Sequence, residues 1–165
     1  MTTASTAPAA PTAPSVSDRI ERSTVINAGR ERVWRALTEA ERFGTWFGAN
    51  LAAQEFKPGA RVRGNITIPG FTHVMFDAVF QRIEPQDLVS FNWHPYAVEP
   101  GVDYDSEEPT LVTFTLEDAP NNATLLTVVE SGFDKVPAHR RAQAFQMNSG
   151  GWEGQLRNIV RYVTQ

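Results

Sequence analysis

The chain has 165 residues, a length that fits one domain better than two. Its 41% hydrophobic and 21% charged residues are typical of a globular protein and exclude disorder of the whole chain. With 15 basic against 19 acidic residues, it lacks the basic excess that binding to nucleic-acid phosphates requires. It has no cysteine, which excludes disulfides, thiolate nucleophiles and cysteine-held zinc or iron–sulfur centres.

Residues 1–17 differ in composition from the rest of the chain. They are almost entirely Ala, Thr, Pro and Ser and include no basic residue, so they do not resemble a secretory signal. We expect a disordered tail over residues 1–17 and a single domain over residues 18–165. No apolar run has the length of a membrane span, and we expect a cytoplasmic protein without membrane insertion.

The domain begins with a strand and two short helices. Residues 18–27 alternate in polarity and contain the β-branched run Thr24, Val25 and Ile26, which predicts a strand. Apolar residues then follow helical spacing in two successive segments. The first segment carries Val33, Trp34 and Leu37, and the second carries Phe43, Trp46 and Phe47.

The middle of the chain predicts a series of antiparallel strands. Pro58-Gly59 and Pro69-Gly70 each occupy the two central positions of a predicted type II turn. Apolar residues alternate along five stretches, which predicts strands joined mostly as hairpins. These stretches are residues 61–68, 73–84, 87–94, 110–117 and 124–132.

The connection over residues 95–109 is longer than the others and rich in acidic residues and proline. Such a loop is either a cover over a functional site or a solvated excursion. The chain then closes with a helix whose stripe includes Trp152, Leu156 and Ile159. Gly150 and Gly151 lie inside this helix, where they predict either a kink or a close approach of another surface.

This order of elements predicts an α+β fold. We expect a curved antiparallel sheet of about six to seven strands, wrapped on the long C-terminal helix, with two short helices after strand one. The sheet has a one-sided apolar pattern, and the long helix is the element able to cover it. A curved sheet around one helix leaves an apolar cavity between them, which is the default position for a ligand.

One set of residues runs in order through nearly the whole ordered chain: Val33-Trp34, Ala36-Leu37, Trp46-Phe47, Phe91-Asn92-Trp93, Glu130-Ser131-Gly132-Phe133, Gly151-Trp152, Leu156, Ile159 and Tyr162. In these residues the chain resembles the helix-grip (SRPBCC) superfamily of START and birch-pollen-allergen-like domains, and within it the Hsp90 ATPase activator homologue group. The resemblance implies the helix-grip fold but is a poor guide to function. We expect no Hsp90 partner, because the tail leaves no room for the separate Hsp90-binding domain of the eukaryotic activators.

The predicted cavity has candidate ligand-binding and candidate catalytic residues. Glu130 is in phase with inward-facing residues of its strand, where a carboxyl group could move protons together with His94 or Tyr96. The alternative for Glu130 is a buried polar group hydrogen bonded to a tyrosine, a histidine or water. The candidate ligand-binding residues are Trp46, Phe47, Phe76, Trp93, Phe114, Glu130, Met147 and Trp152; for Trp152 a role in the core is the alternative.

Metal and cofactor chemistry find no support in the sequence. Asp103, Asp105 and Glu107 alternate as in a calcium loop, but Glu108 and Phe114 occupy the positions where an EF-hand needs Gly and Glu. No serine lies in a Gly-x-Ser-x-Gly elbow, and no glycine-rich dinucleotide fingerprint is present. We therefore expect no metal and no cofactor.

Three hypotheses about function remain. The leading one is a protein, either monomer or homodimer, that binds a small aromatic or lipid-like molecule in its cavity, gated by residues 95–109. The second is a cofactor-free cyclase, isomerase or hydrolase acting on an aromatic or polyketide-like substrate. The third is an interaction module of the co-chaperone kind.

Overall fold

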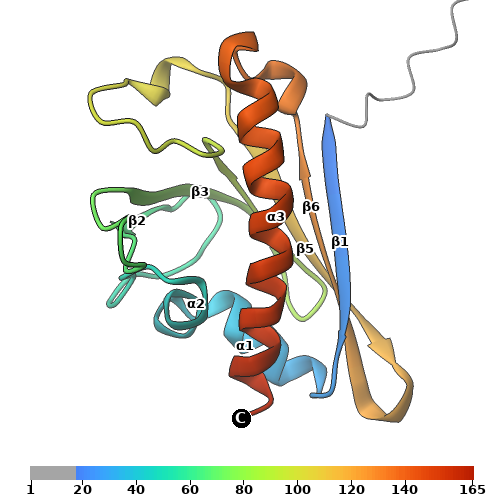
Figure 1. Cartoon of the computed structure of the whole chain (residues 1–165). Coiled ribbons are helices and arrows are strands. Elements are labelled where there is room, and N and C mark those ends of the chain that lie inside the picture. Colours follow the sequence, from blue (N-terminus) through green and yellow to red (C-terminus); the bar gives the residue numbers. More distant parts are fainter. Residues whose placement is uncertain (1–17) are drawn as a thin grey trace, which may run out of the picture.

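The computed structural model describes residues 18–165, so the tail predicted over residues 1–17 lies outside the described residues. The described chain forms one sheet with a long helix across it and two short helices at one end (Figure 1). The main elements are β1 (Arg19–Ile26), α1 (Arg30–Thr38), α2 (Ala40–Phe47), β2 (Arg61–Asn65), β3 (Met75–Glu84), β4 (Leu88–Trp93), β5 (Thr110–Ala119), β6 (Ala123–Ser131) and α3 (Ala138–Val163).

The six strands pair antiparallel in the order β1-β6-β5-β4-β3-β2. The chain therefore passes along the sheet through four hairpin-like connections, and β1 closes the far edge beside β6. The register places Glu130 of β6 opposite Ile20 of β1 and Val112 of β5, with Thr110 opposite Trp93. The α+β helix-grip architecture predicted from the sequence is confirmed, and the sheet formed by residues 18–165 has six strands.

The strand boundaries differ from the prediction by one to three residues, and the shifts in β2 and β3 bear on the site. β2 ends at Asn65 rather than Ile68, because Ile66 leaves the ladder and forms an isolated bridge with Ala49. β3 begins at Met75 rather than His73, because the connection through Pro69-Gly70 continues that far. The ends of both strands thus open into one long loop, which forms part of the site described below.

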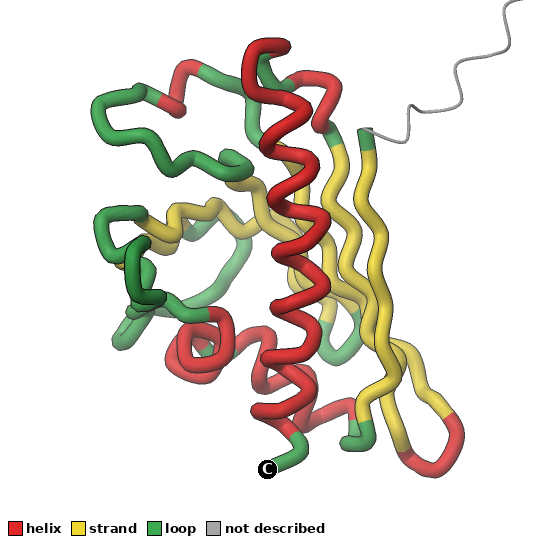
Figure 2. Tube along the Cα trace, viewed as in Figure 1, coloured by secondary structure: helices red, strands yellow, loops and turns green. Residues whose placement is uncertain are grey.

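Helix α3 runs along one face of the sheet, with β6 and β1 to its right in this view, while α1 and α2 lie near the C-terminal end of α3 (Figures 1 and 2). Its buried residues include Ala144, Trp152, Leu156 and Ile159, at the spacing of one helical face. Trp46 links the two short helices, because its indole nitrogen donates a 2.8 Å hydrogen bond to the carbonyl of Ala36.

Aromatic rings form the part of the core that packs between α2 and the sheet. Five phenylalanines with at most 2% of their surface exposed, Phe43, Phe76, Phe80, Phe91 and Phe114, come from α2 and three neighbouring strands. Their rings pack edge to face or tilted, the geometries that aromatic pairs prefer. This packing fixes α2 against the sheet at one end of the cavity.

Helix α3 continues without interruption through Gly150 and Gly151. The prediction that another surface approaches these glycines closely is wrong, because a Cβ atom added at either position would meet nothing within 4 Å. Close approach occurs instead at Gly64 of β2, where a Cβ would lie 1.9 Å from the carbonyl oxygen of Asn50.

Candidate functional site

A cavity of about 560 Å³ lies between the β2–β3 hairpin, the loop over residues 94–105 and the middle of α3. This volume falls within the range of pockets that hold small molecules. Phe47, Phe76 and Trp93 form its inner wall, and Asn148 and Gly151 contribute the surface of α3. The cavity lies where β4 has ended, so that the first residues of β3 pair only with β2.

The inner wall consists of three aromatic rings in mutual contact. The ring centroids of Phe47 and Phe76 are 5.3 Å apart, and each lies 6.0 Å from that of Trp93. All three pairs are edge to face, with interplanar angles of 63–77°. The first two rings are otherwise buried, so the wall is a rigid extension of the core.

The rim of the cavity carries exposed apolar side chains. Ile68, Phe71, Met75 and Val102 each expose 40–44% of their surface, and all four line the cavity. Exposed large apolar side chains that gather at one place mark binding surfaces, whereas scattered ones carry no such meaning. Ile68 and Phe71 come from the β2–β3 connection, Met75 is the first residue of β3, and Val102 comes from the loop opposite.

Behind the inner wall, the carboxylate of Glu130 is completely buried. One oxygen accepts hydrogen bonds from the indole nitrogen of Trp93 (2.7 Å) and the hydroxyl of Thr110 (2.6 Å). The other accepts from the amide of Asn148 (2.8 Å) and the indole nitrogen of Trp152 (2.9 Å). The four donors come from β4, β5 and α3, so Glu130 ties the helix to the sheet.

These four donors match the capacity of a carboxylate, which accepts at about four positions. A buried polar group is stable only when its hydrogen bonds are satisfied, and this one is satisfied without a cation. The surroundings of Glu130 are therefore those of the second hypothesis from the sequence, a buried polar group whose hydrogen bonds are satisfied. Its partners, however, are two tryptophans, a threonine and an asparagine.

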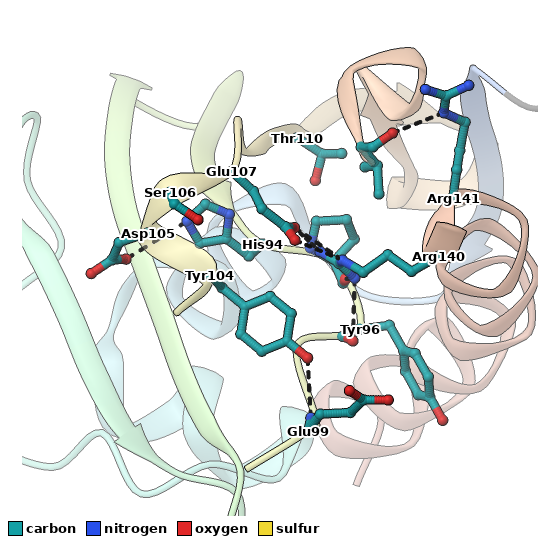
Figure 3. Close-up of polar contacts among 12 residues, drawn as sticks. His94, Tyr96, Glu99, Tyr104, Asp105, Ser106, Glu107, Thr110, Arg140 and Arg141 are labelled. Atoms are coloured by element: carbon teal, nitrogen blue, oxygen red, sulfur yellow. Dashed lines mark hydrogen bonds and ion pairs between the residues drawn. The ribbon is translucent and has the colours of Figure 1, made fainter. Parts of the chain in front are cut away.

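His94 follows Trp93 and lines the cavity beside the loop. Its Nε2 atom lies 3.8 Å from a carboxylate oxygen of Asp105, and its Nδ1 atom is buried without a hydrogen-bond partner (Figure 3). Burial lowers the pKa of His94 below its ordinary value, although the carboxylates of Asp105 and Glu107 partly oppose this. His94 is therefore a neutral polar group at pH 7.

Two arginines of β2 stand at the mouth of the cavity, and both contact Asp77 of β3. Arg61 forms a bidentate pair with this carboxylate at 2.9 and 2.7 Å, and Arg63 lies 3.5 Å from it. The Arg61 guanidinium also lies 3.6 Å from Asp105. Its hydrogen bonds hold the pKa of Asp77 below the usual range for an aspartate, against the opposing effect of burial.

Arg140, at the start of α3, holds the loop over residues 95–109 against the helix (Figure 3). Its guanidinium binds Glu107 at 2.6 and 2.9 Å and donates a 2.7 Å hydrogen bond to the carbonyl of Pro95. It also lies 4.9 Å from the ring centre of Tyr104, whose hydroxyl accepts a 3.1 Å hydrogen bond from the backbone of Glu99. One side chain thus fixes both ends of the loop and its middle.

Within this loop Tyr96 has a φ angle of +50°, a left-handed conformation that a bulky residue seldom adopts. Its carbonyl lies 3.5 Å from the Arg140 guanidinium, and its side chain lines the cavity. The conformation turns the chain away from β4, so that the loop passes over the cavity instead of continuing the sheet.

The structure brings together five of the residues that the sequence proposed for the site and places the others elsewhere. Phe47, Phe76, Trp93, His94 and Tyr96 line the cavity. Glu130 and Trp152 lie behind its wall, Trp46 and Phe114 are in the core, and Met147 is on the exposed side of α3. Of the three candidate catalytic residues, His94 and Tyr96 line the cavity, whereas Glu130 does not.

Several residues of the site were not predicted. Asn148 precedes Trp152 by four residues, so helical periodicity places both on one face of α3. This periodicity could have indicated Asn148, instead of Met147, as a residue of the site. The pair of Arg140 and Glu107, separated by 33 residues, leaves no signal in the sequence. Arg61 and Asp77 were not proposed for the site either; both are partly exposed, and both line the cavity.

A six-stranded antiparallel sheet wrapped on one long C-terminal helix, with a cavity between them, defines a helix-grip protein. The chain belongs to the family described as "Activator of Hsp90 ATPase homolog 1-like protein", which matches residues 27–164. No curated protein matches the sequence significantly.

Solved structures with the same fold include proteins from several bacteria. DynU16, from the dynemicin biosynthetic locus, is 26% identical with a TM-score of 0.65; the match covers 90% of this chain but only 48% of DynU16, so this chain spans about half its length. MLL2253 from Mesorhizobium loti is 24% identical over 88% of this chain and 96% of its own, with a TM-score of 0.65. CalU16 from Micromonospora echinospora is 18% identical over 88% of this chain and 75% of its own, with a TM-score of 0.59.

Two further findings concern residues 18–165. No helix in this range combines the length and the apolar character needed to cross a membrane. Nor does this part of the chain contain a group of three or more His, Asp and Glu side chains placed to hold a metal ion.

Proposed function

We propose that this protein binds a small apolar molecule, aromatic or lipid-like, in the cavity between the β2–β3 hairpin, residues 94–105 and α3. The observation that carries this proposal is the aromatic wall of Phe47, Phe76 and Trp93, which faces a space of about 560 Å³. Burying apolar surface against such a wall contributes roughly 25 cal/mol per Å² before ordering costs are subtracted.

The arrangement of the rim supports the same proposal. Apolar side chains exposed to water at the mouth give an entering ligand a continuous apolar path to the wall. The loop held by Arg140 then forms the upper side of the cavity. A ligand too large to pass between this loop and the β2–β3 connection requires the loop to open, and we propose that residues 95–109 gate access.

Gly151 provides a direct test. It borders the cavity and a Cβ added there meets nothing within 4 Å, so we expect Gly151→Leu to place an apolar side chain in the cavity and occupy part of the space that a ligand needs. Gly150→Leu is the matched control, because Gly150 is equally unobstructed but does not line the cavity. Both substitutions replace a helical glycine by a good helix former.

The experiment is a thermal-shift screen of the wild type and both variants against aromatic, lipid and polyketide-like compounds. A ligand present at a hundred times its Kd stabilises the fold by about 2.7 kcal/mol, which raises the Tm by several degrees. We expect hits that persist in Gly150→Leu and vanish in Gly151→Leu. Hits that survive Gly151→Leu would place the ligand elsewhere and refute the proposal.

A second candidate, a cofactor-free cyclase or isomerase, draws on one specific observation. His94 presents a neutral ring with an unpartnered Nδ1 beside the cavity, next to the loop that carries Tyr96. Glu130 is fully occupied by its four donors, so this candidate depends on His94 and Tyr96 alone. Turnover of a compound found in the screen, lost in His94→Gln with binding retained, would support it.

A further inference from the structure

The buried carboxylate of Glu130 determines which atom of Asn148 faces the cavity. Asn148 lines the cavity, and its amide nitrogen donates to Glu130 at 2.8 Å. A carboxylate accepts hydrogen bonds only, so the amide cannot be turned around without placing two oxygens against each other. The carbonyl oxygen of Asn148 is thereby directed away from Glu130 and remains available as an acceptor.

The other three donors make this orientation rigid. The indole nitrogens of Trp93 and Trp152 can only donate, and each occupies a different oxygen of Glu130. With Thr110 on the third position, the fourth is left for Asn148. The α3 side of the cavity therefore presents a fixed hydrogen-bond acceptor next to the aromatic wall.

The charges of the cavity favour the same kind of ligand group. Arg61 and Arg63 are the arginines that line it, and both are within 3.5 Å of the Asp77 carboxylate. The other carboxylates along the lining are Glu99, Asp103 and Asp105. Four carboxylates against two paired guanidiniums leave a negative balance of two. Because burial keeps His94 uncharged, it adds no cation at pH 7.

From these two observations we infer that the cavity selects an apolar molecule that carries an N–H or O–H donor, an amine above all, and discriminates against carboxylates. The donor of the ligand pairs with the Asn148 carbonyl oxygen while its apolar body lies against Trp93 and Phe76. This inference rests on the proposed function and adds the chemistry of the polar end of the ligand. Asn148 is then a specificity-determining residue of the site.

The test uses four probes with a common naphthyl body that end in an aminoethyl, a hydroxyethyl, an ethyl or a carboxymethyl group, each titrated calorimetrically. We expect the amine to bind at least tenfold more tightly than the ethyl compound, since one satisfied hydrogen bond is worth roughly a factor of ten. The alcohol should lie between the two, and the carboxylate should bind most weakly. A carboxylate that binds as tightly as the amine would overturn the inference.

Two variants locate the cause. Asn148→Leu removes the acceptor but leaves Glu130 three donors, so the amine and the alcohol should lose about tenfold relative to the ethyl probe. The double variant Glu99→Gln with Asp103→Asn should reduce the advantage of the amine over the alcohol while leaving the alcohol unchanged. An end-group preference that is identical in wild type and Asn148→Leu would overturn the role of Asn148. If that variant does not fold, the order of the four probes on the wild type still decides the inference.

The Gly151→Leu variant separates this inference from the proposed function. If it abolishes binding of all four probes but the wild type shows no order among them, the binding proposal stands and the inference about the donor is wrong. If none of the probes binds to the wild type, or if Gly151→Leu binds them unchanged, the proposed function fails first, and the inference fails with it.

Discussion

Arg140 and Glu107 form an ion pair in which two guanidinium nitrogens donate to the same carboxylate oxygen, at 2.6 and 2.9 Å, and both side chains are only 11–12% exposed. Removing one partner of such a pair leaves the other charge without compensation in a place where water reaches it poorly. The pair joins the first turn of α3 to the far end of the loop over the cavity. Its loss should therefore destabilise the closed position of the loop and leave the pairing of the sheet intact.

We therefore expect Arg140→Gln to increase the opening of residues 95–109 about a hundredfold, equivalent to about 3 kcal/mol. Amide hydrogen exchange followed by mass spectrometry measures this, with β5 and β6 as internal references. Arg141→Gln is the control, because Arg141 donates only to the nearby carbonyl of Val136. Unchanged exchange in the loop of Arg140→Gln would show that the pair does not hold it closed.

Glu130→Gln changes one atom of the carboxylate but affects two of the four donors. The new amide nitrogen cannot accept, so an indole N–H and a hydroxyl or amide are left facing a donor in the core. We expect the free energy of unfolding to fall by about 2–4 kcal/mol in urea titrations. Glu117→Gln, on the exposed end of β5, should change it little. A loss below about 1 kcal/mol would mean that the network adapts.

His94 makes stability depend on pH in a defined direction. Burial lowers its folded-state pKa below the ordinary value of about 6.5, so on acidification the unfolded chain takes up the proton first. The contribution of His94 is therefore fully present above about pH 6.5 and is lost as the pH falls toward the lower pKa of the folded state. The charged groups that act on it are Asp77, Asp105, Glu107 and Arg140.

Urea unfolding at intervals from pH 8 to pH 5 tests this assignment. The difference in unfolding free energy between wild type and His94→Gln should be constant above neutrality and shrink below about pH 6.5. His139→Gln, at an exposed position at the start of α3, serves as the control. A difference that grows on acidification would show that His94 is charged in the folded protein.

Two glycine substitutions should act in opposite directions. Gly150→Ala places a methyl group in open space on a long helix and should raise the free energy of unfolding by about 1 kcal/mol. Gly64→Ala forces a Cβ to within 1.9 Å of the Asn50 carbonyl oxygen and should lower it by about 3 kcal/mol. Thermal unfolding of both variants measures these changes. Changes of the same sign would contradict the prediction that Gly150 lies in open space and Gly64 in close contact.

The general fold could be predicted from the sequence because it depends on local patterns. Alternation in five stretches, helical spacing around Trp152 and Ile159, and the order of these elements were enough to predict an antiparallel sheet around a terminal helix. The ends of β2 and β3 were harder, since the bridge between Ala49 and Ile66 involves two segments far apart in the chain.

The site divides in the same way. Periodicity alone determined that Phe76, Trp93 and Glu130 point inward, because the side chains of a strand alternate between its two faces. Which of them reaches the cavity, and which is enclosed behind it, was decided by where β4 stops and the loop departs at Tyr96.

Only the tertiary structure gathered Trp93, Thr110, Asn148 and Trp152 around Glu130, and Arg140 around Glu107. A hydrogen bond or an ion pair acts over a few ångströms whatever the separation of its partners in sequence, so one sequence contains no local record of it. The sequence by itself therefore determined the architecture and the inward faces of the strands. The packing of α3 on the sheet decided which inward residues meet, and with them the chemistry of the cavity.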